Sequence, residues 1–336
     1  MAILITGGAG FVGSHFVELM LKQSNEQLIC LDNFNDYYDP ALKRENVAAF
    51  QGHERVTVVE ETFCDHGAME HLFSRNHIRF VVHLGAYAGV RPSVQRPLVY
   101  EESNVRGTLV LLEAARRHPV ERFLLCSSST VYGRGAAVPF HEDQPLGSPM
   151  SPYGATKRAA ELLGLTYVDL HRVPVVCVRP FSVYGPRLRP DLALTIFTEA
   201  ILSGRPFPLF GDGTIRRDFT HVSDICDGIA ATLHAKGVEG EIINLGHSDP
   251  IEMRQLIALI EDAAGRKANI DRRPPTPEDM PITYADLTKA ERLLGYCPKM
   301  PIDAGVREFV AWYRERRSGQ TAHGQNREQI APALSA

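Results

Sequence analysis

The stretch Ile3–His15, ILITGGAGFVGSH, places three glycines at a spacing of three residues directly after a run of branched apolar residues. The apolar run predicts a buried strand, and the residues from Gly10 onward predict the start of a helix. Gly7, Gly10 and Gly13 then lie in the turn, where backbone without side chains approaches a pyrophosphate at a helix N-terminus. The triplet alone is weak evidence, because tight turns and close packing also use glycine.

An acidic residue at the end of the second predicted strand strengthens this interpretation. The run LICLDN places Asp32 about 20 residues beyond Gly13, where a carboxylate accepts hydrogen bonds from an adenosine ribose. A carboxylate there repels a 2′-phosphate, so the pattern favours NAD over NADP; a turn or capping role for Asp32 is the alternative. Asp65 follows the third predicted strand and is expected either at the adenine edge or as a helix N-cap.

The alternation of short apolar runs with amphipathic segments predicts an α/β fold with a doubly wound parallel sheet, the Rossmann architecture. We expect residues 1–180 to form this NAD-binding domain. Residues 181–317 are expected to form mainly a smaller α/β substrate lobe, with some chain returning to the first domain, and residues 318–336 a disordered tail. The expected strands are 2–6, 27–32, 56–60, 80–84, 123–128 and 175–179, and the expected helices are 12–23, 67–75, 104–117, 153–171, 192–203, 222–235, 252–264 and 303–317.

Composition excludes several classes of protein. The net charge of the 336 residues is −4 and the basic residues are scattered, which argues against a nucleic-acid binder. Six cysteines stand singly without metal-ligand spacing, so we expect free, mostly buried thiols in a reducing cytosol and no metal site. The first residues show neither a signal peptide nor a membrane span, which predicts a cytoplasmic protein.

A second group of chemically active residues follows the fifth predicted strand. The run FLLCSSSTVYG brings four hydroxyl side chains, Ser127 to Thr130, to the carboxyl edge of the sheet, where such folds bind ligands. Tyr153 and Lys157 lie one helical turn apart on one face. A lysine ammonium and the positive nicotinamide of NAD⁺ both favour the phenolate, so we expect a lowered pKa for Tyr153 and a role as base. Alone, such a pair is common on solvated helices.

The glycine triplet, the serine ahead of Tyr132 and Gly133, and the Tyr153/Lys157 pair together resemble an extended short-chain dehydrogenase/reductase, up to about Arg317. Further stretches resemble nucleotide-sugar epimerases, most of all UDP-glucuronate 4-epimerases. The resemblance implies an isomerase that oxidises C4 of a UDP-sugar with NAD, lets the 4-keto sugar rotate, and returns the hydride to its other face. The stretches are Asn33–Asn46, Ala88–Pro97, Tyr184–Leu194, Phe210–Ile225 and Thr283–Lys299.

The resemblance also implies roles for individual residues. Ser128 is expected to bind the reacting hydroxyl, and Lys157 also to orient the nicotinamide ribose. Arg217 is expected at the diphosphate, with a surface ion pair to Asp218 as the alternative, and Phe210 at the uracil. Asn104 is expected near the cofactor, or as an N-cap. The remaining expected cofactor contacts are Phe11, Val12, Asn33 and Leu84, and the remaining expected substrate contacts are Arg91, Ser129, Thr130, Ser182 and Arg189.

Two positions favour an acidic sugar. Dehydratases and decarboxylases that resemble this chain usually carry an acid where it has Thr130, and UDP-galactose 4-epimerases commonly carry asparagine where it has Ser182. Hydroxyls there can hold a carboxylate, with Arg189 supplying charge. Two departures, Tyr87 instead of glutamine and SPYGATK instead of SLYAATK, leave other substrates open.

Four alternatives therefore remain: a UDP-glucose 4-epimerase, a UDP-N-acetylglucosamine 4-epimerase, a UDP-glucuronate decarboxylase, and a non-catalytic NAD-binding scaffold. The resemblance also implies a homodimer that pairs the expected helices 104–117 and 153–171 of each subunit.

Overall fold

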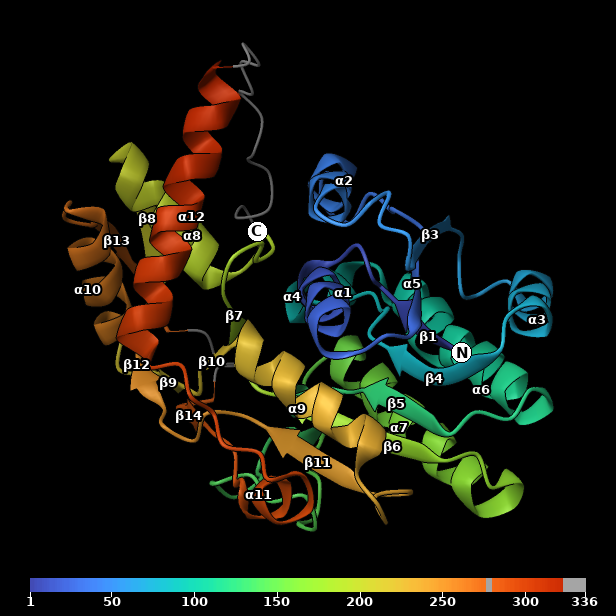
Figure 1. Cartoon of the computed structure of the whole chain (residues 1–336). Coiled ribbons are helices and arrows are strands. Elements are labelled where there is room, and N and C mark those ends of the chain that lie inside the picture. Colours follow the sequence, from blue (N-terminus) through green and yellow to red (C-terminus); the bar gives the residue numbers. More distant parts are fainter. Residues whose placement is uncertain (276–279, 323–336) are drawn as a thin grey trace.

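The structure, a computed structural model, describes residues 1–275 and 280–322. Its centre is a parallel sheet of seven strands (Figure 1). The strand order is β3-β2-β1-β4-β5-β6-β11, so the direction of winding reverses between β1 and β4. The predicted doubly wound sheet is confirmed. The strands are β1 (Ala2–Thr6), β2 (Gln27–Asp32), β3 (Val56–Glu60), β4 (Ile78–His83), β5 (Arg122–Cys126), β6 (Val175–Pro180) and β11 (Ile242–Leu245).

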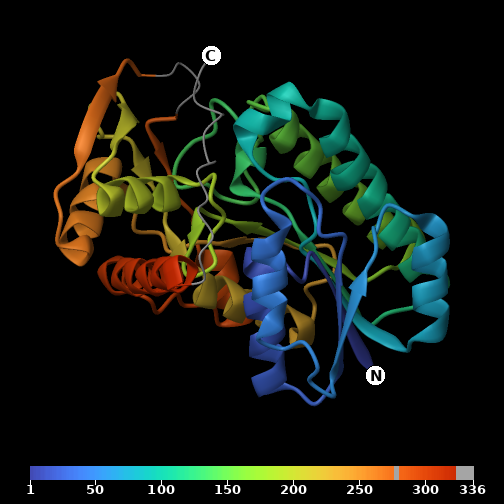
Figure 2. The same cartoon turned by 90° about the horizontal axis from the view of Figure 1, so that it is seen from above.

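Helices cover both faces of this sheet, as the view from above shows (Figure 2). One layer contains α1 (Phe11–Gln23) and α9 (Val222–His234), and the other contains α3 (His66–Arg75), α6 (Thr108–Arg117) and α7 (Pro152–His171). Alternate residues of β1 supply the two cores: Ile3 and Ile5 pack in the first layer, and Leu4 packs in the second. Burial on both faces explains why the strands read as continuous apolar runs.

Short helices and turns connect these layers at the carboxyl edge of the sheet. Asp39 caps the N-terminus of α2 by accepting from the Ala41 amide at 3.0 Å, and Pro40 occupies the first turn. A π-helical turn precedes α6 within the helix that the sequence predicts over 104–117. The connecting elements are α2 (Pro40–Ala48), α4 (Val90–Gln95), α5 (Pro97–Glu101), η1 (Glu102–Gly107) and η2 (Ser129–Tyr132).

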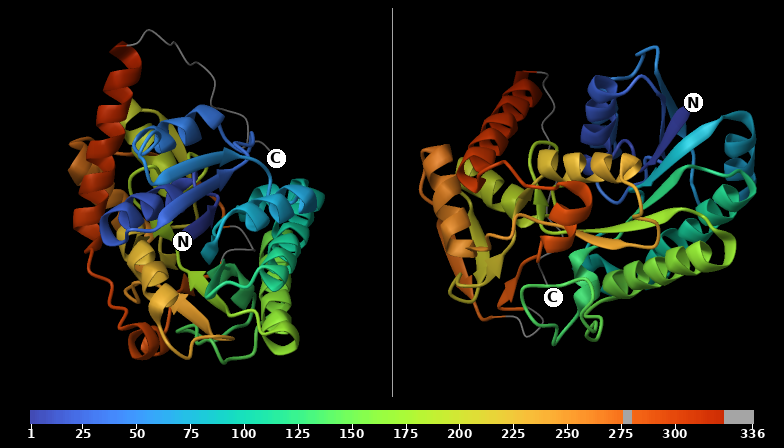
Figure 3. Two further views of the ribbon diagram at one scale, coloured as in Figure 1. Left: turned by 45° about the vertical axis from the view of Figure 1, so that its right-hand side comes forward. Right: turned by 60° about the horizontal axis from the view of Figure 1, so that its bottom comes forward.

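A smaller lobe of mixed structure lies beside the sheet (Figure 3). Strands β8 and β13 pair in parallel, and three helices pack nearby. The chain also returns to the main sheet, because β11 pairs with β6. The elements are β7 (Val183–Tyr184), α8 (Ala193–Ser203), β8 (Pro206–Phe210), β9 (Arg216–Arg217), β10 (Thr220–His221), β12 (Ile251–Glu252), α10 (Met253–Ala264), β13 (Asn269–Arg273), β14 (Ile282–Thr283), α11 (Thr288–Leu294) and α12 (Ile302–Ala322).

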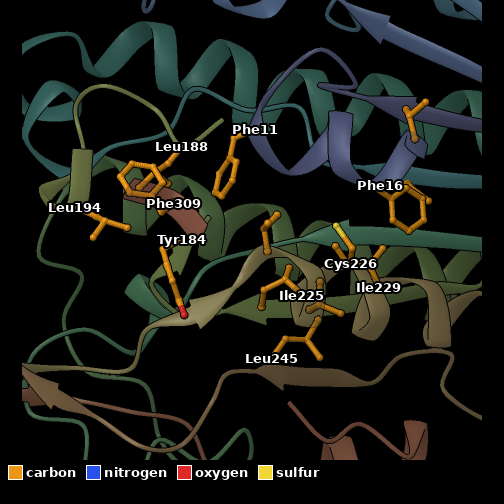
Figure 4. Close-up of a cluster of buried hydrophobic side chains, with 14 of the residues drawn as sticks. Phe11, Phe16, Tyr184, Leu188, Leu194, Ile225, Cys226, Ile229, Leu245 and Phe309 are labelled. Carbon is orange, nitrogen blue, oxygen red and sulfur yellow. The ribbon is translucent and has the colours of Figure 1, made fainter. Parts of the chain in front are cut away.

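One hydrophobic core joins the two parts of the chain (Figure 4). Phe16 of α1 and Ile229 of α9 belong to the same buried cluster as Leu194 of α8 and Phe309 of α12. Because the side chains from both parts interlock, the smaller lobe is fixed against the edge of the sheet that carries the functional residues.

Three further details concern the C-terminal helix, the cysteines and the length of the helices. Helix α12 continues to Ala322, past the start of the expected tail, and the rest of that tail lies outside the described residues. All six thiols are free, but Cys297 is exposed while Cys30, Cys177 and Cys226 are buried. Every helix within the described ranges is too short or too polar to cross a lipid bilayer.

A buried ion pair ties α7 to β6. The guanidinium of Arg179 donates to both carboxylate oxygens of Glu161 at 2.8 Å, and these side chains are 2% and 4% exposed. The guanidinium also lies 4.6 Å from the centre of the Tyr132 ring. Removing one partner of such a pair leaves an uncompensated buried charge.

We expect Arg179→Met to lower the free energy of unfolding by about 3–5 kcal/mol, because the buried carboxylate of Glu161 loses the partner that compensates it. Urea denaturation followed by circular dichroism measures this loss. The control is Arg307→Met, which removes the exposed pair that Arg307 forms with Asp303 on α12. An Arg179 variant as stable as the Arg307 variant contradicts the expectation.

Candidate active site

The turn between β1 and α1 is built from close backbone contacts. Gly7 has φ of +67°, and a Cβ there would lie 2.8 Å from Gly85 in the loop after β4. A Cβ on Gly13 would lie 2.1 Å from the Gly7 carbonyl oxygen. Gly10 is the N-cap of α1, and no side chain caps this N-terminus. The first-turn amides of Phe11, Val12 and Gly13 are therefore suited to hold an anion such as a pyrophosphate.

A cavity of about 670 Å³ opens beside this turn and follows the carboxyl edge of the sheet. Its size and its position at the reversal of strand order suit the adenosine half of a dinucleotide. Four of the predicted cofactor residues line it: Gly7, Asp32, Asn33 and Asp65.

Asp65 and Asn104 have structural partners of their own. Asp65 caps α3 by accepting from the Ala68 amide at 2.8 Å, so the expected N-cap is confirmed. Asp65 also lines the cavity, and its expected place at the adenine edge stays a prediction. Asn104 is no N-cap, because it lies inside the π-helical turn η1. Its amide bonds the backbone N–H and C=O of Tyr87, both at 2.9 Å, and donates to Thr156 on α7 at 3.1 Å. Asn104 thus fixes the loop that carries Tyr87, which lines the cavity.

The three predicted catalytic residues meet at the end of β5. Ser128 begins η2, and its hydroxyl oxygen accepts from the Thr130 hydroxyl at 3.0 Å. Helix α7 begins at Pro152 because Ser151 caps it, accepting from the Gly154 amide at 3.1 Å, and this start places Tyr153 in the first turn. Lys157, one turn later, is buried and donates to the Cys126 carbonyl oxygen at 2.8 Å.

The expected lowering of the Tyr153 pKa is wrong for the chain by itself. Burial raises the pKa of Tyr153 to about 12, and a hydrogen bond with Ser128 and the charge of Arg189 only partly offset that effect. Burial also lowers the pKa of Lys157. Both shifts favour the neutral form of the side chain. The protein alone therefore keeps the phenol protonated at neutral pH.

Two predicted substrate residues, one from the sheet domain and one from the smaller lobe, contact each other. The guanidinium of Arg91 on α4 lies 5.2 Å from the centre of the Phe210 ring on β8. This cation–π contact joins the sheet domain to the smaller lobe. It brings together a cation and an aromatic ring, the types of group that bind a nucleotide.

Arg189 is close enough to influence Tyr153, but its charge is already paired. Asp191 accepts from Nε and Nη2 of Arg189 at 3.0 and 2.9 Å, and the Tyr37 hydroxyl donates to the same carboxylate at 3.2 Å. Ser129, Thr130 and Ser182 are each partly buried, so their hydroxyls remain near the surface of the site. The Nε and Nη2 edge of Arg189 is therefore open to a ligand only when that ligand replaces Asp191, while Nη1 takes no part in these two bonds.

The surface ion pair considered for Arg217 is wrong. Asp218 is fully buried and accepts three backbone hydrogen bonds, from His247, Ser248 and Ala285. Arg217 itself donates to the Met280 carbonyl oxygen at 2.8 Å. Its expected place at a diphosphate stays a prediction.

Several residues near the site were not found from the sequence as site residues. Asn35 and Lys43 line the cavity, as do Glu102 and Arg106. The Asp39-Pro40 pair was an available signal for α2, which carries Lys43, because aspartate at the N-cap followed by proline marks a helix start. Among the described residues, no group of three or more His, Cys, Asp or Glu side chains could hold a metal ion.

Comparison with known proteins identifies the family. The model of the NAD dependent epimerase/dehydratase family matches residues 3–246. The chain belongs to this family. Its membership confirms the expected class of enzyme and NAD as the cofactor.

Individual relatives show which members of the family this chain is similar to. The UDP-glucuronate 4-epimerase of Thermodesulfobacterium geofontis is 39% identical over 93% of this chain and 96% of its own length. The crystal structure of UDP-glucuronic acid 4-epimerase from Bacillus cereus, in complex with UDP-glucuronic acid and NAD, is 33% identical with a TM-score of 0.89. It covers 94% of this chain and 100% of that chain. The dTDP-glucose 4,6-dehydratase of Streptomyces venezuelae, crystallised with NAD, is 31% identical with a TM-score of 0.88, over 95% of this chain and 98% of that one.

The raised pKa of Tyr153 gives a direct prediction for the protein freed of cofactor. A phenol with a pKa of about 12 stays protonated at pH 10, where an ordinary tyrosine is about half ionised. The difference in near-ultraviolet absorbance between the wild type and Tyr153→Phe is therefore expected to show no phenolate from Tyr153 up to that pH. A phenolate signal near neutral pH contradicts it.

Proposed function

We propose that the protein is an NAD-dependent UDP-glucuronate 4-epimerase, which interconverts UDP-glucuronate and UDP-galacturonate. The observation that carries this proposal is the intact group of Ser128, Tyr153 and Lys157, with Thr130 where related dehydratases carry an acid. The relatives named above support the choice of UDP-glucuronate. The complete catalytic group argues against a silent NAD-binding scaffold.

The reaction assigns a separate task to each side chain. Tyr153 takes the proton from the C4 hydroxyl and later returns it, while Ser128 donates a hydrogen bond to the C4 oxygen as it becomes a carbonyl. Lys157 holds its position through the Cys126 carbonyl and contributes positive charge beside the phenol when protonated. Bound NAD would supply the hydride acceptor for the oxidation at C4 and the hydride donor for the reduction at the opposite face of the sugar ring.

The residues assigned to NAD follow the carboxyl edge of the sheet. The amides at the N-terminus of α1 suit the pyrophosphate, and the cavity beside Asp32 suits the adenosine. We assign cofactor contacts to Gly7, Gly10, Phe11, Val12, Gly13, Asp32, Asn33, Asp65, Leu84, Tyr153 and Lys157, with Asn104 acting through the Tyr87 loop.

Hydroxyl groups near the catalytic residues suit the carboxylate of an acidic sugar. Oxidation at C4 makes a β-keto acid, which loses CO₂ when the carboxylate bond aligns with the ketone. Charge-assisted hydrogen bonds from Ser129 and Ser182 oppose that alignment by fixing the carboxylate. The Thr130 hydroxyl, which donates to Ser128 in the structure, adds a third when it turns to the carboxylate. Arg91, Phe210 and Arg217 are assigned to the nucleotide portion.

We expect the purified protein to convert UDP-glucuronate into UDP-galacturonate without releasing a UDP-pentose, as read by NMR. UDP-glucose and UDP-N-acetylglucosamine serve as rival substrates, and turnover of these alone contradicts the proposal. Tyr153→Phe is expected to reduce turnover about 10²–10⁴-fold while retaining NAD.

Tyr100→Phe is the matched control for that variant. It removes a hydroxyl that donates to the Ala88 carbonyl, from a ring whose centre lies 6.2 Å from that of Tyr153. Turnover by the control is expected to stay within a few fold of the wild type. An equal loss in both variants would show that the aromatic cluster, and not the Tyr153 hydroxyl, limits the reaction.

We further propose that two copies of the chain pair through α6 and α7. These neighbouring helices form one outer face of the sheet domain (Figure 2). That face leaves Leu162 and Leu170 of α7 exposed by 59% and 70%, and Leu109 of α6 exposed by 37%. Leucines that are exposed together on one helix layer are typical of an interface.

The wild type is therefore expected to have twice the chain mass of 37.3 kDa by light scattering. Leu162→Glu combined with Leu170→Glu is expected to give a monomer, because charges at the centre of an apolar interface are not compensated. Retained NAD and an unchanged circular dichroism spectrum verify that the variant is folded. A folded variant that remains dimeric contradicts this interface.

A further inference from the structure

A buried lysine stands beside the acidic residue that the sequence assigns to the adenosine ribose. Nζ of Lys43 on α2 lies 3.3 Å from Oδ1 of Asp32, and the two side chains are only 7% and 5% exposed. Both residues line the cavity at the carboxyl edge of the sheet. A buried pair of this kind places a positive charge in a site where the sequence predicts only a negative one.

Lys43 is held firmly in this place. Its ammonium donates to Oδ1 of Asn35 at 3.0 Å as well as to Asp32, and it lies 5.5 Å from the centre of the Tyr38 ring. Asp32 also accepts from the Phe34 amide at 2.9 Å, again through Oδ1. An ammonium has three donors, and two are used here, while Oδ2 of Asp32 takes no part in these bonds. One donor of Lys43 and one oxygen of Asp32 therefore remain for a ligand.

The pairing changes how this site discriminates between dinucleotides. A lone carboxylate repels a 2′-phosphate, but an ion pair of Asp32 and Lys43 is neutral as a unit. The ammonium attracts the phosphate that the carboxylate repels, so the two effects oppose each other within a few ångströms. The preference for NAD is then a difference between these two interactions.

We propose that Lys43 is a specificity-determining residue for the dinucleotide: paired with Asp32 it limits the preference for NAD, and without Asp32 it accepts the 2′-phosphate of NADP. The inference rests on the proposed use of NAD by this site. A purely structural role for Lys43 has a different consequence: loss of Lys43 would then weaken the binding of both dinucleotides equally.

The neighbouring Arg44 provides a matched comparison. Arg44 is the next residue on α2, but it does not line the cavity, and its guanidinium pairs with the exposed Glu60. Its guanidinium carbon lies 4.5 Å from the centre of the Phe34 ring. Arg44 supplies the same charge from the same helix without facing the cavity, so it separates general electrostatic attraction from a specific contact.

The experiment compares the wild type with Lys43→Met, Asp32→Ser, Asp32→Ser/Lys43→Met and Asp32→Ser/Arg44→Met. Lys43→Gln is added as a neutral side chain that can still donate to Asn35, in case the methionine variant does not fold. Each protein is equilibrated with equal excesses of NADH and NADPH and separated from free dinucleotide. The bound dinucleotides, including any retained from purification, are released by denaturation and measured by mass spectrometry.

In the wild type, NAD(H) is expected to exceed NADP(H). Asp32→Ser is expected to raise the ratio of NADP(H) to NAD(H) about tenfold or more, the size of one charge-assisted hydrogen bond. That gain is expected to vanish in Asp32→Ser/Lys43→Met and to persist in Asp32→Ser/Arg44→Met. Lys43→Met and Lys43→Gln are expected to lower the ratio below that of the wild type.

Other results would show whether the role of Lys43 or the proposed NAD site is wrong. A gain that survives the loss of Lys43, or that depends on Arg44 instead, overturns the role of Lys43 and leaves the proposed function intact. An equal loss of both dinucleotides in the Lys43 variants also overturns it, because only a structural role has that effect. A wild type that holds no dinucleotide, or mainly NADP(H), overturns the proposed NAD site and this inference with it.

Discussion

The close approach of the Gly7 and Gly85 backbones is the constraint on which the rest of the site depends. Strands β1 and β4 are neighbours in the sheet, and the chain winds away from them in opposite directions. The turns that leave them must therefore separate and create a crevice, while the backbones at their base remain in contact. A side chain at Gly7 would push the two turns apart and displace the N-terminus of α1, where an anion can bind, whereas a Cβ at Gly85 would first meet the Phe63 ring at 2.5 Å.

Burial then determines the chemistry of the residues placed along that crevice. It raises the pKa of Tyr153 and lowers the pKa of Lys157, so both shifts oppose ionisation in the protein alone. A positive charge bound beside the phenol acts in the opposite direction by Coulomb attraction. The phenolate is thus scarce until a cationic ligand is in place, which couples the supply of the base to binding.

The parts of this structure that could be predicted are those where burial leaves a periodic apolar pattern. The six predicted strands all exist, and five of them are largely buried and read as apolar runs. The edge strand β3, VTVVE, is only partly buried and was predicted from its branched apolar residues. Helix α2 was missed because its buried side includes Lys43 and Asn46 along with Val47, so it shows no apolar stripe. The pKa of Tyr153 was mistaken for a related reason: the spacing to Lys157 is visible in the sequence, but the depth of burial is not.

Paired charges recur around the site, and the Arg189/Asp191 pair shows what this means for a substrate. An acidic sugar that approaches Nε and Nη2 of Arg189 must replace Asp191, which already forms two hydrogen bonds with that edge of the guanidinium. One carboxylate then exchanges for another, so the net gain in binding free energy is small. Asp191 becomes hydrated and keeps the Tyr37 hydroxyl as a hydrogen-bond partner. A neutral sugar leaves the pair intact and gains nothing from it. Under the proposed function, we therefore expect discrimination between acidic and neutral sugars to come mainly from the hydroxyls of Ser129, Thr130 and Ser182, which have no carboxylate partner to displace among the described residues.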